Sequence, residues 1–159
     1  MNITIVAVGK IKEKYLAGGI GEYTKRLKAY CRLNIIEVAD RQAPESLSPP
    51  QLEEVLNQEG QDILKAVKSG SHIIALDPTG RKMSSEGMAE YMNRLAVTGS
   101  SNVTFIIGGS NGLSTEVLNR ADLRLSFSDM TFPHQLMRLI LLEQIYRWFK
   151  ISRGEPYHK

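Results

Sequence analysis

Five short β-rich segments alternate with five amphipathic segments along the chain, and this order constrains the fold more than any other feature. The β-rich runs are almost continuously apolar and predict strands at residues 1–8, 33–39, 72–77, 103–107 and 123–127. Apolar residues at helical spacing predict helices at residues 13–30, 51–67, 85–96, 114–119 and 133–150. This alternation is typical of an α/β fold with a mainly parallel sheet and helices on both faces. The longest loop-like run, residues 41–50, is predicted to be mobile.

Length and composition fit one domain. The 159 residues suit a single domain over residues 1–159, and no apolar run reaches the roughly 20 residues of a membrane span. Residues 1–8 are followed by lysines, the reverse of a secretory signal, so we expect a cytoplasmic protein without a membrane partner. Cys31 is the only cysteine and is expected to be a packing residue. The histidines stand far apart in the sequence, so we expect no metal.

The segments that follow the strands are the candidates for ligand binding, because open parallel sheets bind ligands beyond the carboxyl ends of their strands. Neither a G-x-G-x-x-G dinucleotide fingerprint nor a G-x-x-x-x-G-K-[ST] phosphate loop occurs, which disfavours nicotinamide and ATP chemistry. The predicted turn at residues 77–80 and the segments 108–112 and 128–134 follow the last three strands. Glycines in the segment 108–112 allow backbone to approach a ligand closely, although a plain tight turn would use them equally well.

Basic residues concentrate at the two ends of the chain. The net charge is +3, but residues 9–32 hold seven bases against Glu13 and Glu22. A second basic segment begins at His134. The two segments would form one field for phosphates if the fold brought them together, whereas solvated helix faces would have the same composition. Charge therefore permits, without requiring, a nucleic-acid partner.

Four sequence stretches form a distinctive set: FIIGGSNG at residues 105–112, LSFSDMTFPHQL at 125–136, EQIYR at 143–147 and GEPYHK at 154–159. Together they resemble the ribosomal RNA large subunit methyltransferase H family of the SPOUT superfamily. The similarity extends over the whole chain, including IVAVG at residues 5–9 and the strand end Leu76–Asp77.

The resemblance implies a homodimer with a C-terminal trefoil knot that binds S-adenosylmethionine. It further implies methylation of N3 of a pseudouridine in large-subunit (23S) ribosomal RNA on the assembled ribosome. The residues that it assigns to the cofactor pocket are Leu76, Gly108, Phe127, Ser128, Asp129, Met130, Thr131 and Phe132.

The acceptor N3 carries a weakly acidic proton, so a base or a cation near it would accelerate methyl transfer. His158 is the first candidate base, and Tyr157 beside it offers stacking or a hydrogen bond. His134 is the second candidate, although a hydrogen bond within its loop is an equally good role for it. Arg147, together with Arg138 and Arg153, is predicted to bind phosphate or a uracil carbonyl. Since the tail could not act untethered, we expect it to dock, with the partner's pocket as one possible place.

The last predicted helix is apolar around most of its circumference, which indicates burial on more than one side and favours a dimer. Two other functions stay open. A non-catalytic ribosome- or RNA-binding module would use the same basic surface without binding the cofactor, and a related methyltransferase would modify a different RNA nucleotide. A small hydrolase is disfavoured, because Ser110 and Ser114 lack a G-x-S-x-G setting.

Overall fold

A computed structural model describes residues 1–41 and 45–159 and contains one five-stranded sheet. The elements along the chain are β1 (Asn2–Val8), α1 (Lys14–Leu27), β2 (Arg32–Val38), α2 (Pro49–Ala66), β3 (His72–Lys82), α3 (Ser85–Val97), β4 (Asn102–Ile107), α4 (Thr115–Arg120), β5 (Leu123–Ser126) and α5 (His134–Ser152). The strand order is β2-β1-β4-β3-β5, and every pairing is parallel. The predicted alternation and the parallel sheet are therefore confirmed.

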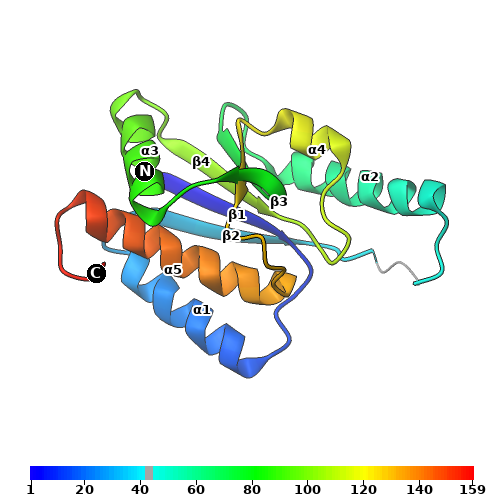
Figure 1. Ribbon diagram of the computed structural model, residues 1–159, viewed down its shortest axis with the longest axis horizontal. Coiled ribbons are helices and arrows are strands. Elements are labelled where there is room, and N and C mark those ends of the chain that lie inside the picture. Colours follow the sequence, from blue (N-terminus) through cyan, green and yellow to red (C-terminus); the bar gives the residue numbers. More distant parts are fainter. Residues whose placement is uncertain (42–44) are drawn as a thin grey trace.

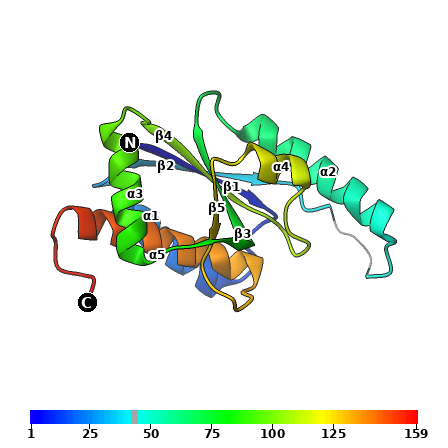
Figure 2. The same cartoon turned by 45° about the horizontal axis from the view of Figure 1, so that its top comes forward.

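Helices cover both faces of the sheet, as predicted. Helices α1, α3 and α5 lie on one face, while α2 and α4 lie on the other (Figures 1 and 2). Successive side chains of β1 serve the two layers in turn: Ile3 and Ile5 are buried beneath the three-helix layer, and Val6 and Val8 beneath the two-helix layer. Burial on both faces explains why the strands are apolar at almost every position.

Helix α5 lies between α1 and α3 and contacts both of them (Figure 1). Leu141, Leu142 and Ile145 are fully buried, and Trp148 packs against Phe105 of β4. The helix is thus buried on more than one side within the chain itself, as its all-round apolar pattern predicts. This arrangement is consistent with a C-terminal knot, which stays a prediction.

Side-chain capping fixes where three of the helices begin. Ser84 accepts a hydrogen bond from Gly87 N at 3.0 Å, and Ser114 accepts one from Val117 N at 3.2 Å. Before α2, Ser48 N donates to Gln51 Oε1 at 3.0 Å. These contacts satisfy backbone groups that a helix terminus leaves without partners. Residues 42–44 of the run predicted to be mobile lie outside the described residues, and the end of that run forms the first turn of α2.

The predicted end of the third strand is wrong. The sequence predicts a strand that ends at Asp77 and a turn at residues 77–80, but β3 continues to Lys82. Leu76 and Arg81 both pair with Leu125 of β5, so the residues between them form a bulge. Gly80 permits this bulge, because a Cβ there would lie 2.6 Å from the carbonyl oxygen of Arg124.

Cys31 has the predicted packing role, because its side chain packs against the core beneath the three-helix layer. This burial raises the pKa of its thiol to about 11.

Gly60→Ala tests the packing of α2 on α4. A Cβ at Gly60 would lie 2.4 Å from Ser114 Oγ and 3.2 Å from Val117 Cγ2, and rotation of Ser114 away from it would break the α4 cap. We expect a net loss of about 1–3 kcal/mol in the free energy of unfolding, because overpacking outweighs the better helix propensity of alanine. Urea unfolding measures this change.

Gly18→Ala is the matched control, because Gly18 is also helical but has no heavy atom within 4 Å of its Cβ position. Here we expect a gain of about 0.5–1 kcal/mol from helix propensity alone. Equal effects of the two substitutions would contradict the packing argument.

Candidate functional site

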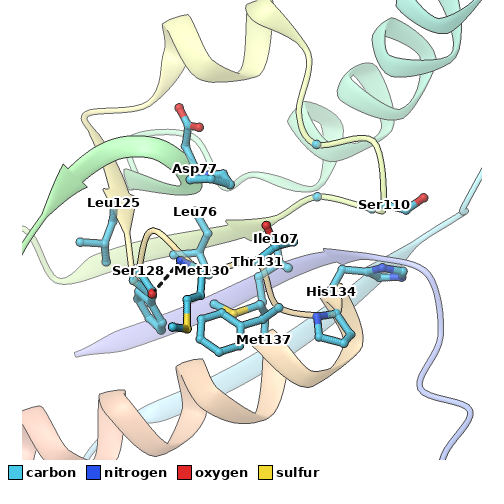
Figure 3. Close-up of a pocket in the computed structure, with 17 residues that line it drawn as sticks. Leu76, Asp77, Ile107, Ser110, Leu125, Ser128, Met130, Thr131, His134 and Met137 are labelled. Atoms are coloured by element: carbon cyan, nitrogen blue, oxygen red, sulfur yellow. Dashed lines mark hydrogen bonds between the residues drawn. The ribbon is translucent and has the colours of Figure 1, made fainter.

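A cavity of about 550 Å³ lies between the bulge of β3 and the carboxyl ends of β4 and β5. Its walls come from that bulge, from the loops after β4 and β5 and from the first turn of α5 (Figure 3). The lining residues are Leu76, Asp77, Pro78, Ile107, Gly108, Gly109, Ser110, Gly112, Leu125, Phe127, Ser128, Met130, Thr131, Phe132, Pro133, His134 and Met137. The sheet has placed the cavity at the edge where parallel sheets bind their ligands.

Seven of the eight residues predicted to bind a cofactor line this cavity: Leu76, Gly108, Phe127, Ser128, Met130, Thr131 and Phe132. Asp129 is the exception. Its side chain is 83% exposed and pairs with Lys82, so it lies outside the cavity lining. Leu125 and Met137 line the cavity without having been predicted. Met137 lies one helical turn after His134, so helical spacing from that residue could have indicated it.

Local hydrogen bonds shape the loop of residues 127–133. Ser128 O accepts from Ser126 Oγ at 3.2 Å, and Ser128 Oγ accepts from Met130 N at 2.9 Å (Figure 3). In the loop after β4, Gly112 N donates to Gly109 O at 3.1 Å. A Cβ on Gly108 would lie 2.6 Å from Gly112 O, so only glycine lets these backbone segments pack so closely. Backbone amide and carbonyl groups therefore form part of the cavity wall.

The cavity wall is mainly apolar, and Asp77 and His134 are its ionisable lining residues. Asp77 Oδ1 accepts from Thr79 N at 3.0 Å and from Thr79 Oγ1 at 2.9 Å. Its carboxylate is directed away from Met130 and Thr131 in Figure 3. His134 begins α5, and its Nε2 would lie 4.0 Å from a Cβ on Gly9. Asp77 and His134 are therefore the cavity-lining residues whose side chains could exchange a proton.

The C-terminal tail docks on its own chain. Tyr157 Oη donates to Glu143 Oε1 at 3.1 Å and lies 3.3 Å from Tyr23 Oη. Glu155 accepts from Tyr30 Oη and from Lys150 Nζ, both at 2.8 Å. The tail is thereby joined to α1 and α5, which agrees with the expectation that it is tethered.

Arg147 connects the tail to α5. Its Nε and Nη2 contact Glu143 Oε1 at 3.0 and 2.5 Å, and its guanidinium lies 4.8 Å from the centre of the Tyr157 ring. The Glu143 carboxylate raises the pKa of Arg147. Arg147, Tyr157 and His158 thus form one cluster, as their predicted common role requires.

Both ring nitrogens of His158 are occupied. Nδ1 lies 3.1 Å from Arg147 Nη1, and Nε2 contacts Glu86 Oε1 of α3. Because a guanidinium only donates, Nδ1 must be the acceptor, and Nε2 must carry the proton that it donates to Glu86. The ring nitrogen that accepts a hydrogen bond is therefore the one that Arg147 contacts.

The four predicted catalytic residues do not come together within one chain. His134 lies at the start of α5, and Arg147 lies thirteen residues further along the same helix. At 1.5 Å per residue these positions are about 20 Å apart along the helix axis. The cavity and the tail cluster therefore occupy opposite ends of α5.

The predicted role of Arg138 is wrong. It was expected to bind phosphate or a uracil carbonyl, but it is 3% exposed. Its Nη1 contacts Glu37 Oε2 at 2.5 Å, and its Nη2 donates to Gly9 O at 3.0 Å. Burial and these partners leave it a structural role, which is to hold α5 against the ends of β1 and β2.

Within residues 1–41 and 45–159, no group of three or more His, Cys, Asp or Glu side chains is arranged to hold a metal ion. His72 lies at the start of β3, away from the cavity, and its Nε2 lies 2.6 Å from Tyr91 Oη. None of the described helices is long and apolar enough to cross a membrane.

Lys150→Met tests how the tail is anchored. The hydrogen bond from Lys150 is the largest cause that lowers the pKa of Glu155 from its ordinary value of 4.5, followed by the one from Tyr30. A lowered pKa means that this contact stabilises the docked tail above about pH 4.5 and is lost as the pH falls through the lowered value. In the variant we expect the pKa of Glu155 to rise toward 4.5.

A ¹³C NMR titration of the side-chain carboxyls measures this shift, with Lys65→Met as a control at an exposed position of α2. An unchanged titration of Glu155 in Lys150→Met would show that the ion pair does not hold the tail.

Comparison with known proteins agrees with this geometry. Residues 1–158 match the family model described as predicted SPOUT methyltransferase. Proteins named ribosomal RNA large subunit methyltransferase H, from Carboxydothermus hydrogenoformans and Clostridioides difficile, are 62% and 61% identical to the chain over 159 residues, which is 100% of each sequence. The corresponding protein of Alkaliphilus oremlandii is 60% identical with the same coverage.

Two solved structures share the fold at low sequence identity. A probable methylase family protein from Haemophilus influenzae has a TM-score of 0.54 at 16% identity, over 99% of this chain and 70% of its own. A probable methyltransferase from Bordetella pertussis has a TM-score of 0.53 at 11% identity, over 93% of this chain and 96% of its own. The family match over nearly the whole sequence and the full-length relatives together show that the chain belongs to the SPOUT methyltransferase family.

Proposed function

We propose that the protein is a ribosomal RNA methyltransferase that uses S-adenosylmethionine to methylate N3 of a pseudouridine in large-subunit (23S) RNA, on the assembled ribosome in the cytoplasm. The observation that carries the proposal is the apolar cavity between the bulge of β3 and the ends of β4 and β5, in a chain 54–62% identical over its full length to proteins named ribosomal RNA large subunit methyltransferase H.

The cavity fits the proposed cofactor in size and chemistry. Small-molecule sites typically enclose about 300–1,000 Å³ and are lined mainly by apolar groups, with a few polar groups that fix orientation. Leu76, Ile107 and Phe127 offer apolar surface for an adenine, and the backbone at Gly108 offers hydrogen bonds. When bound, S-adenosylmethionine would supply a methyl group activated by its positively charged sulfur.

The protein's own task is to position the acceptor and to remove its proton. Methyl transfer would form an N3–carbon bond as the carbon–sulfur bond breaks, with its electron pair left on sulfur, and it would require the N3 proton to leave. In the tautomer that its contacts imply, His158 can take that proton only at Nδ1. We therefore infer that Arg147 turns its N–H from Nδ1 to a carbonyl oxygen of the base, which frees the imidazole and stabilises the developing anion. His134 is the alternative base.

A homodimer would unite the two halves of the site. In one chain the cavity and the His158 cluster lie at opposite ends of α5, but two-fold symmetry can bring the tail of one protomer to the cavity of its partner. Met130 is 76% exposed and Phe132 is 36% exposed near the mouth of the cavity. Such large apolar side chains are usually covered, so they support an interface here. The proposed C-terminal knot would fix the cavity loops beside α5.

Cofactor binding separates this function from a non-catalytic RNA-binding module. Calorimetry with S-adenosylmethionine is expected to show saturable binding at one cavity per protomer. Ribosomes should be methylated much faster than an isolated RNA hairpin. Mapping the methylated nucleotide tests whether it is a pseudouridine. Binding of RNA without binding of the cofactor would favour the module instead.

Mixed dimers test the composite site. His158→Ala is expected to keep cofactor binding and to lose about 10²–10⁴-fold in turnover, the usual contribution of a proton-transfer group. Leu76→Trp is expected to fill the cavity and to abolish cofactor binding, which calorimetry checks. Each homodimer should then be inactive.

Co-expression of the two variants should restore about one quarter of the wild-type activity, because half of randomly formed dimers are mixed and each contains one intact site. No restoration would place the tail and the cavity of one protomer in the same site, whereas unchanged turnover of His158→Ala alone would move the base to His134 or to water.

A further inference from the structure

The connection between β1 and α1, together with the first two residues of α1, is an exposed basic segment next to the cavity. Residues 10–15 read Lys-Ile-Lys-Glu-Lys-Tyr, and the side chains of Lys10, Lys12, Lys14 and Tyr15 are all exposed. In Figure 1 this connection runs past the start of α5. Lys12 N donates to Gln135 Oε1 at 3.1 Å, which joins the segment to the residue that follows His134. The segment therefore borders the end of the cavity that contains His134.

The segment is held firmly at its base. Gly9 bends the chain with a φ of +89°, and its carbonyl oxygen accepts the hydrogen bond from the buried Arg138. Gly9 N donates to Val38 O at 2.9 Å. Because these contacts fix where the segment leaves the sheet, its side chains are presented at a defined place beside the cavity.

The lysines of this segment differ from the other bases near α5. Arg26, Arg147 and Lys150 pair with Glu22, Glu143 and Glu155 respectively. Within the part of the chain that the structure describes, no ion pair involves Lys10, Lys12 or Lys14. Two acids lie nearby: Glu13 belongs to the segment, and Asp40 Oδ2 would lie 3.8 Å from a Cβ on Gly9. Three ammonium groups against these two carboxylates still leave this segment with positive charge available to an anionic partner.

Tyr15 supplies a different kind of contact. It is 71% exposed, whereas Tyr23, Tyr30, Tyr146 and Tyr157 pack against one another or against Phe149. In residues 1–41 and 45–159 its ring has no aromatic or cationic partner. An exposed aromatic ring among unpaired lysines is the combination that binds single-stranded nucleic acid, since bases stack on the ring and phosphates bind the ammonium groups.

We propose that Lys10, Lys12, Lys14 and Tyr15 form a docking surface for the RNA strand that flanks the target nucleotide. The three lysines bind backbone phosphates, and Tyr15 stacks on an unpaired base next to the one that enters the site. This inference rests on the proposed function, because it makes RNA the occupant. A protein partner would bind more favourably to exposed apolar side chains such as Met130 and Phe132 than to a strip of three cations with one isolated ring.

The test compares Lys10→Ala/Lys12→Ala/Lys14→Ala with the control Lys65→Ala/Lys68→Ala/Arg120→Ala, which removes equal charge from the α2 and α4 layer. The first readout is ribosome binding by sedimentation, without cofactor, at several salt concentrations. Each phosphate contact contributes about 0.7 to the slope of log affinity against log salt for a single strand, so the first variant should lose up to about 2 in slope. The control should keep the wild-type slope.

Tyr15→Ala should weaken ribosome binding by about 5- to 150-fold, as expected for the loss of one stacked base, while Tyr15→Phe should stay within about twofold of wild type. The triple lysine variant and Tyr15→Ala should both retain wild-type cofactor affinity and the wild-type oligomeric state. Unchanged ribosome binding in these two variants would overturn the proposal. Loss of the dimer or of cofactor binding in either of them would overturn it as well. Since the first readout needs no methyl transfer, failure of the wild-type enzyme to methylate would count against the proposed function alone.

Discussion

Burial of both faces of the parallel sheet is the constraint on which the rest of the structure depends. Every strand must be covered by helices on two sides, so the chain crosses from strand to strand through helices and all carboxyl ends meet at one edge. The bulge of β3 and the loops after β4 and β5 therefore lie close together, although they are separated in sequence. The cavity is a consequence of that convergence, and its apolar walls continue the core outward.

Helix α5 separates the cavity from the cluster of tail residues. Its first turn closes the cavity with His134 and Met137, and its last turns hold the tail through Glu143, Arg147 and Lys150. A helix is stiff, so the two groups of residues stay apart within one chain. Only the proposed homodimer would bring the tail of one protomer close to the cavity of its partner.

Hydrogen bonding in the tail bears directly on the proposed chemistry. Arg147 can only donate, and this fixes the proton of His158 on Nε2, where Glu86 accepts it. If His158 is the base, as proposed, this arrangement is a resting one, since Arg147 occupies the nitrogen that would take up the proton. Glu143, Glu155 and Glu86 take part in several of the tail contacts, so a bound phosphate-rich RNA would compete with them for Arg147 and Lys150. Lys10, Lys12 and Lys14 form no ion pair within the described residues and face no such competition.

Much of this protein was determined by the sequence alone. Near-continuous apolar runs and apolar residues at helical spacing predicted all ten elements, because burial acts on each segment locally, and the motifs at residues 105–112 and 125–136 predicted most of the cavity lining. The β3 bulge, the burial of Arg138 and the outward position of Asp129 were decided only by the tertiary structure. Each depends on a partner distant in sequence: Leu125 for the bulge, Glu37 for Arg138 and Lys82 for Asp129. Local patterns do not encode such pairings, because they form only when the sheet and α5 bring those residues together.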